Sequence, residues 1–218
     1  MARKGSIPAL FTFLLAAGRG LAGTVDIAIT DGDGKPAADT VVTLNGSAVT
    51  DPAALSRLPG EAIIDQRDET FIPLVSLIRR GGHVVFTNHD HTMHQVYSFS
   101  AIKQFEFEID EGQRSEPVVF DKAGLSSIGC NIHDQMITYV FVSDTPYAAL
   151  TDVGGRAQIA EVPAGAYRAR LWNPRTLPGA DVPSPTVTVG GGVARLSASL
   201  SLMAAAMPGM KHPHTQSY

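Results

Sequence analysis

The sequence of 218 residues has little of three things: cysteine, long apolar runs and an excess of basic residues. Its one cysteine, Cys130, has no partner for an internal disulfide, so the fold does not depend on one. No run of 18 apolar residues follows the N-terminal segment, and such a run is what a membrane-spanning helix needs. There are 17 basic and 21 acidic residues. The sequence has no cluster of basic residues of the kind that would indicate a nucleic-acid partner. The single thiol is therefore the most informative group in the chain.

The first residues have the composition of a secretory signal peptide. Two basic residues precede the apolar segment 7–17, and small residues follow up to Ala22. We expect residues 1–22 to be removed and the mature chain to begin near Gly23, in the periplasm. Three basic residues leave with the signal, so 14 basic residues remain against 21 acidic ones, a net charge of −7. A free thiol in an oxidising compartment needs protection, and a bound metal would provide it.

Much of the remaining chain alternates apolar and polar residues, with Gly and Pro between the runs. Phe105, Phe107 and Ile109 alternate with acidic residues, which places them on one face of an extended segment. The same alternation recurs at 25–30, 41–46, 83–88, 139–142, 167–172 and 196–202. A period of two residues predicts an all-β, sandwich-like fold. Only 51–58 indicates a short helix, with Asp51 as its N-cap.

Cys130 begins the segment CNIHDQM, which also contains His133 and Met136. A thiolate, two imidazole nitrogens and a distant thioether are the donor set of a type 1 copper site. Zinc gains nothing from a thioether and prefers a closed tetrahedral set with harder or additional thiolate ligands. A second histidine must come from elsewhere in the chain. The segment VVFTNHDHTMHQVYSFS, residues 84–100, offers His89, His91 and His94.

The segment 84–100 resembles the cupredoxin family, which includes plastocyanin, pseudoazurin and amicyanin. In that family an apolar strand ends in Asn, and the ligand His lies six residues later, as Asn88 and His94 do here. The Cys-x-x-His-x-x-Met spacing is most similar to amicyanin. The resemblance implies a Greek-key sandwich that binds one copper ion per chain through His94, Cys130, His133 and Met136. It also implies that His133 has the exposed edge, with Met93 and Ile132 beside it.

Most of the mature chain resembles the cupredoxin-type proteins labelled methylamine utilization proteins. That group has two adjacent histidines before Val-Tyr-Ser, whereas Met93-His94-Gln95 keeps one candidate ligand here. The other histidines of this region, His83, His89 and His91, are expected to be solvated, and a second, looser metal site is the alternative. The tail 203–218 is rich in Met and His and is expected to be disordered, with copper scavenging as the alternative.

The segment 148–202 resembles the carboxypeptidase regulatory-like β-sandwich, through a Thr-Asp-x-x-Gly hairpin and a Val-Pro-x-Gly-x-Tyr turn. In that family the hairpin is preceded by an N-terminal segment that residues 23–44 resemble. We expect residues 23–59 and 144–202 to form one small immunoglobulin- or transthyretin-like sandwich, with the cupredoxin domain, about 60–143, inserted into it. The alternative is two separate appendages packed on the copper domain.

The sequence predicts an electron carrier and not an enzyme. Multicopper oxidases place a His directly beside the copper Cys, whereas Gly129 and Asn131 flank Cys130. A thiolate-bridged binuclear centre needs two cysteines. We expect a monomer without a membrane span or a nucleic-acid partner, which exchanges electrons with a periplasmic redox partner, a c-type cytochrome or a dehydrogenase. A periplasmic copper chaperone or copper-buffering protein would use the same ligands and is the alternative.

Overall fold

The computed structural model describes residues 21–46 and 52–204, which form β-strands and one 3-10 helix. The predicted all-β class is confirmed. Most of the expected signal peptide, residues 1–20, lies outside the described residues, as does the tail from 205. The expected tail starts at Met203, whose backbone N–H donates to the carbonyl of Arg175 across 2.7 Å. Within the described ranges no helix is long and apolar enough to cross a membrane.

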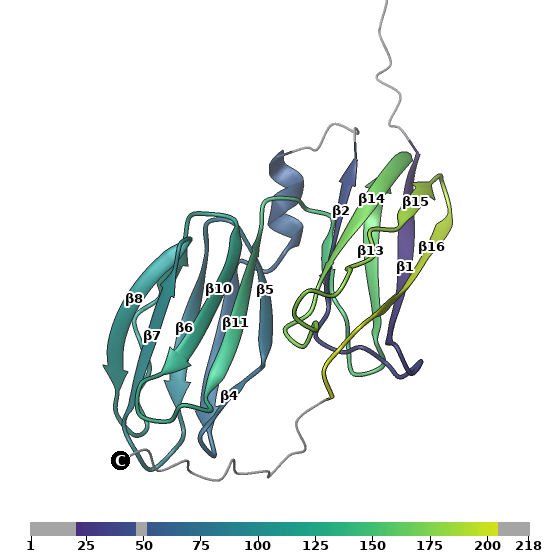
Figure 1. Cartoon of the computed structure of the whole chain (residues 1–218). Helices are drawn as coiled ribbons and strands as arrows, with labels where there is room; N and C mark the ends of the chain where they lie inside the picture. Colours follow the sequence, from purple (N-terminus) through teal and green to yellow (C-terminus); the bar gives the residue numbers. More distant parts are fainter. Residues whose placement is uncertain (1–20, 47–51, 205–218) are drawn as a thin grey trace, which may run out of the picture.

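The middle of the chain, residues 61–143, forms a sandwich of two sheets that we call the central sandwich (Figure 1). One sheet has the order β4-β3-β6-β9, with bounds Thr70–Ile72, Glu61–Arg67, Gly82–Asn88 and Val118–Phe120. The other has the order β5-β11-β10-β7-β8, with bounds Val75–Arg79, Ile137–Ser143, Gly124–Cys130, His94–Ser100 and Lys103–Ile109. Alternate apolar residues of both sheets face each other and bury Ile64, Phe86, Phe120 and Ile128 completely.

Residues 22–46 and 148–200 together form a second sandwich, which we call the split sandwich. One sheet has the order β13-β1-β16, with bounds Arg156–Pro163, Ala22–Asp31 and Val193–Leu200. The other has the order β12-β2-β14-β15, with bounds Ala148–Leu150, Val41–Gly46, Gly165–Trp172 and Thr186–Val189. Alternation in β1 buries Val25, Ile27 and Ile29 in a core that is separate from that of the central sandwich.

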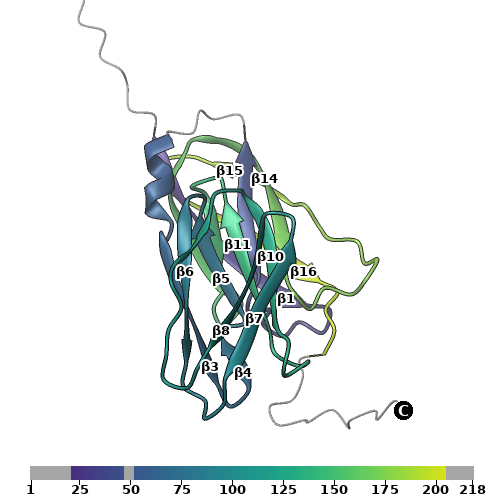
Figure 2. The same ribbon diagram turned by 90° about the vertical axis from the view of Figure 1, so that its left-hand side faces the viewer.

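β1 and β2 therefore pair with strands that follow the central sandwich in the chain. β1 is antiparallel to β13 and parallel to β16, and β2 is antiparallel to β12 and β14. Figure 1 shows the two sandwiches side by side, with β1 and β16 together in the split sandwich, and Figure 2 shows the central sandwich in front of the split one.

The connection between the sandwiches contains the helix expected at 51–58. It is a 3-10 helix, Pro52–Arg57, and not an α-helix. The N–H of Leu58 donates to the carbonyl of Leu55, three residues back, and Pro59 follows directly. A helix this short closes with such bonds and cannot continue through a proline. Asp51, the expected N-cap, lies outside the described residues.

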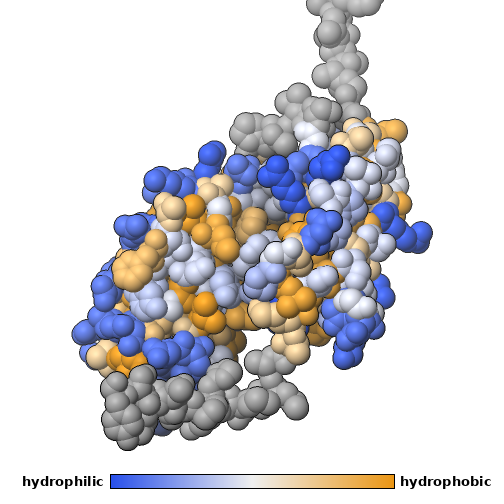
Figure 3. All heavy atoms as spheres, viewed as in Figure 1, coloured by the Kyte–Doolittle hydropathy of each residue, from blue (hydrophilic) through white to orange (hydrophobic). Residues whose placement is uncertain are grey.

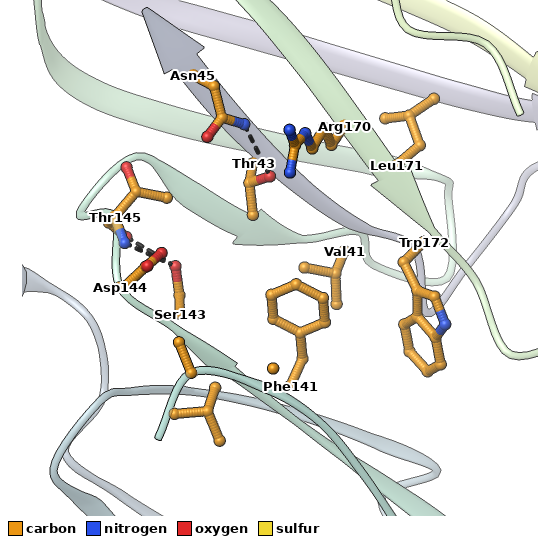
Figure 4. Close-up of a pocket in the computed structure, with 13 residues that line it drawn as sticks. Val41, Thr43, Asn45, Phe141, Ser143, Asp144, Thr145, Arg170, Leu171 and Trp172 are labelled. Atoms are coloured by element: carbon orange, nitrogen blue, oxygen red, sulfur yellow. Dashed lines mark hydrogen bonds between the residues drawn. The ribbon is translucent and has the colours of Figure 1, made fainter. Parts of the chain in front are cut away.

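The sandwiches meet through aromatic side chains. The ring of Trp172 on β14 lies 5.4 Å from that of Tyr139 and 6.2 Å from that of Phe141, both on β11. Burial raises the pKa of Tyr139 above its ordinary value. A pocket of about 420 Å³ opens beside this contact, with Arg170, Thr43 and Asn45 on one wall and Phe141 on the other (Figure 4). On the face shown in Figure 3, apolar side chains lie in small groups among hydrophilic ones.

Candidate metal centre

One end of the central sandwich gathers the residues singled out by the sequence. β6 ends at Asn88, β7 begins at His94, β10 ends at Cys130, and β11 begins at Ile137. β10 and β7 are antiparallel neighbours, and Cys130 pairs with Val96, two residues after His94. The end of one strand and the start of the next therefore bring the thiol and the first imidazole together, although 36 residues separate them.

The loop before His94 is organised by the amide of Asn88. Its Nδ2 donates to the carbonyls of Thr92 and Ile109 at 2.8 and 2.9 Å, and its Oδ1 accepts the N–H of Asp90 at 2.9 Å. Asn88 is buried, so its polar atoms need partners within the protein, and the loop and the end of β8 supply them. This explains why Asn precedes His94 at that spacing.

The loop after Cys130 is short and closed by backbone bonds. The N–H of Met136 donates to the carbonyl of His133 at 2.9 Å, and the N–H of Cys130 donates to that of Met136 at 3.3 Å. Met136 is buried in the same core as Cys130, with 2% of its surface exposed. The structure therefore places the predicted thioether residue at the thiol end of the core.

Three of the four predicted ligands converge. The donor atoms of His94, Cys130 and His133 all lie within 4.8 Å of one another. Sγ of Cys130 is 3.5 Å from Nδ1 of His94, and the two imidazole rings are 5.1 Å apart between centroids. His94 and Cys130 are buried, whereas the His133 side chain is 19% exposed. No other group of three His, Cys, Asp or Glu donors is this close among residues 21–46 and 52–204.

The hydrogen bonds of the two histidines indicate which ring nitrogens are available to a metal ion. Nε2 of His94 lies 2.8 Å from Oδ2 of Asp90. A carboxylate only accepts hydrogen bonds, so Nε2 carries the proton and the lone pair is on Nδ1, facing the thiol. Nδ1 of His133 is buried and has no hydrogen-bond partner among the described residues. An unpartnered buried polar atom costs about 1–3 kcal/mol, so a metal ion at this position fits the donor set.

The remaining histidines of the region pair with carboxylates instead. Nδ1 of His89 lies 2.5 Å from Oδ1 of Asp65, and Nδ1 of His91 lies 2.9 Å from Oε1 of Glu111. His83 lies 3.4 Å from a carboxylate oxygen as well. The hydrogen bond with Glu111 and its charge raise the pKa of His91. These side chains do not join the donor cluster, and the tail histidines His212 and His214 lie outside the described residues.

Two residues of the site had no sequence signal. Asp90, which binds His94, looked like an ordinary loop residue. Glu69 lies in the turn between β3 and β4, and its Oε1 is 3.7 Å from Nε2 of His133. Ile132, within the short loop, and Ile137, directly after it, are 47% and 43% exposed. The partly exposed His133 thus follows an exposed apolar residue in the chain and lies near the carboxylate of Glu69.

No protein-family model matches this chain, and no curated protein matches it. Similar solved structures include a purple cupredoxin from Nitrosopumilus maritimus, with 25% identity and a TM-score of 0.35 over 38% of this chain and 99% of that chain. Amicyanin from Paracoccus versutus has 18% identity and a TM-score of 0.35, over 46% of this chain and 98% of that chain. A copper-containing nitrite reductase from Thermus scotoductus SA-01 has 22% identity and a TM-score of 0.35, over 44% of this chain and 27% of that chain. Each match covers less than half of this chain, so the interpretation of the site depends on its geometry.

Proposed function

We propose that this chain is a periplasmic copper protein that carries single electrons, with one copper ion held by His94, Cys130, His133 and Met136. The observation that carries the proposal is the convergence of a buried thiol and two imidazoles, of which His133 has a buried Nδ1 without a hydrogen-bond partner among the described residues. The thioether of Met136 in the same core favours copper over zinc, because copper accepts a soft axial donor. The periplasmic location is inferred from residues 1–22.

The residues around the site suit electron transfer. A bound copper ion would supply a one-electron couple. Cys130 and His94 are buried, so water is kept away from the thiol. The backbone bonds within the loop 130–136 and the side-chain hydrogen bonds of Asn88 hold the donors in place, so little rearrangement is needed between oxidation states. His133 has the partly exposed ring, and Ile132 and Ile137 beside it offer apolar contacts to a cytochrome or a dehydrogenase.

We propose a carrier and not an enzyme. Gly129 and Asn131 flank Cys130, so no histidine beside the thiol connects it to a second metal centre. The candidate pocket beside Trp172 shares no residue with the donor cluster.

The visible spectrum of the protein after addition of Cu(II) tests the proposal. We expect an intense thiolate-to-copper band, which Cys130→Ala abolishes. Cys130→Ser is the matched variant, because it keeps the size of the side chain and removes only the soft donor. A faint band of the kind given by histidine and oxygen ligands would contradict the type 1 assignment.

The second candidate function is that of a copper chaperone or buffer. The partial exposure of His133 favours it, because one ligand is within reach of an acceptor while the thiol is not. The two functions differ in how firmly Cu(I) is kept. A carrier retains the ion during repeated reduction and oxidation, whereas a chaperone transfers Cu(I) to a high-affinity chelator or acceptor domain within the mixing time.

A further inference from the structure

The carboxylate of Asp90 lies between the first imidazole and the turn that joins β3 to β4. Its Oδ2 accepts from Nε2 of His94 at 2.8 Å and from the backbone N–H of Glu69 at 3.1 Å. Its Oδ1 accepts from the backbone N–H of Asp68 at 2.5 Å. The Asp90 side chain is only 11% exposed. One carboxylate therefore connects a candidate ligand with a segment that is distant in the sequence.

The backbone conformation of that turn is unfavourable unless other groups stabilise it. Asp68 and Glu69 form a two-residue hairpin turn between Arg67 and Thr70, and their φ angles are +51° and +53°. Turns of this type favour Asn-Gly, Asp-Gly or Gly-Gly. Asp68 is tolerated in the left-handed region, whereas Glu69 costs about 1–2 kcal/mol there. The two N–H bonds to Asp90 hold both residues in this conformation.

The same turn also places the side chain of Glu69 near the second imidazole, that of His133. Oε1 of Glu69 is 3.7 Å from Nε2 of His133, and Oε2 accepts from Nε2 of Gln135 at 3.2 Å. A glycine in place of Glu69 would relax the backbone, but it would leave the ring edge of His133 without this neighbour. The side chain of Glu69 thus explains why the turn keeps a residue that is unfavourable for its backbone.

We propose that Asp90 is a positioning residue that sets both imidazoles of the copper site, an inference that rests on the proposed function. It fixes the proton of His94 on Nε2, so that the Nδ1 lone pair faces Cys130. It also holds the β3–β4 turn, so that Glu69 lies over the edge of His133. A carboxylate that accepts the outer N–H of a ligating imidazole strengthens the donor and is typically worth 10–100-fold in metal affinity.

The test compares Asp90→Asn with Glu111→Gln. Both changes neutralise a carboxylate that binds a histidine of the loop 89–94, but Glu111 binds the exposed His91. In Asp90→Asn we expect Cu(II) affinity to fall about 10–100-fold. Cu(I) depends less on a strong imidazole donor, so its affinity should fall less than that of Cu(II). The reduction potential should therefore rise by about 59 mV for each further tenfold by which the Cu(II) affinity falls. Affinity and potential equal to those of Glu111→Gln would overturn the proposal.

Amide hydrogen exchange in the metal-free protein separates this inference from the proposed function. Asn offers one acceptor oxygen in place of two, so the amides of Asp68 and Glu69 should exchange faster in Asp90→Asn and not in Glu111→Gln. Unchanged protection of both amides would overturn the link to the turn, even if copper binds. A missing thiolate band in the wild type would instead remove the proposed function while the exchange result still stands. If Asp90→Asn does not fold, Asp90→Ser is compared in the same way.

Discussion

The backbone N–H of Thr40 donates to Oγ1 of Thr151 across 2.9 Å, although 111 residues separate them. The N–H of Thr151 donates back to the carbonyl of Thr40 at 2.9 Å, and its Oγ1 donates to the carbonyl of Ala37 at 2.7 Å. Thr40 and Thr151 are both buried. The whole central sandwich lies between these residues in the chain, so these bonds join the two halves of the split sandwich.

We propose that residues 23–59 with 144–202, and 60–143, are separate domains, which predicts the outcome of truncation. A fragment of residues 60–143 should fold and bind copper, because its core and its candidate ligands are complete. A chain that ends at residue 147 keeps β1 and β2 but loses β12, β13, β14 and β16, so we expect both strands to lose amide protection and to be prone to aggregation. Strands that stay protected after this truncation would count against the division. Membership of the split sandwich in the carboxypeptidase regulatory-like family stays a prediction.

The choice among the three loop histidines is tested by a matched set of alanine variants. His94→Ala should bleach or shift the thiolate band, because its Nδ1 faces Cys130. His89→Ala and His91→Ala should leave the band in place, because these side chains bind Asp65 and Glu111. Visible absorption of the copper-loaded variants is the measurement. Loss of the band in His89→Ala or His91→Ala would show that the wrong histidine was assigned.

Asp65 predicts a loss of stability in acid. Burial favours the neutral carboxyl, but hydrogen bonds from His89 and Thr87 and the charges of His89 and Arg67 outweigh it and lower the pKa of Asp65. A folded-state pKa below the unfolded one adds stability above the unfolded pKa, and this stability is lost as pH falls through the folded pKa. Asp65→Asn should therefore cost at most about 1 kcal/mol at pH 7, because the group is partly solvated. Denaturant unfolding at neutral and acid pH is the measurement, and the difference from wild type should vanish in acid.

For Asp39 we expect the opposite effect of the ionised carboxyl on stability. Burial raises the pKa of its carboxyl, with the charge of Arg175 acting against this. A raised pKa means that the folded state binds the proton more tightly, so the ionised group destabilises the fold once pH exceeds the unfolded pKa. Its φ is also +58°, a conformation that Asn tolerates as well as Asp. Asp39→Asn should stabilise the protein by about 0.5 kcal/mol at pH 7. A variant that is no more stable than wild type at pH 7, or one whose gain persists in acid, would contradict this account.

The sequence was sufficient for features that depend on local spacing. Alternation identified strands such as β8, and the spacing from Asn88 to His94 reflects one buried amide that shapes one loop. Asp90 and Glu69 could not be found in this way. Their contacts exist because β3 lies parallel to β6, which brings the turn at 68–69 beside the loop after Asn88. Such pairing between distant segments is a property of the assembled sheet and leaves no local pattern.

The parallel pairing of β1 with β16 has a consequence for how the protein is made. β16 follows all the other strands among the described residues, so β1 has no such neighbour until residues 193–200 have been synthesised. The central sandwich, in contrast, has all its strands by Ser143. Domains generally fold as units, so the central sandwich with the candidate ligands is able to fold first. Until the later strands are made, β1 and β2 have unpaired edges, and such edges favour aggregation. Of the two sandwiches, the split sandwich is thus completed later and is the more exposed to interrupted synthesis.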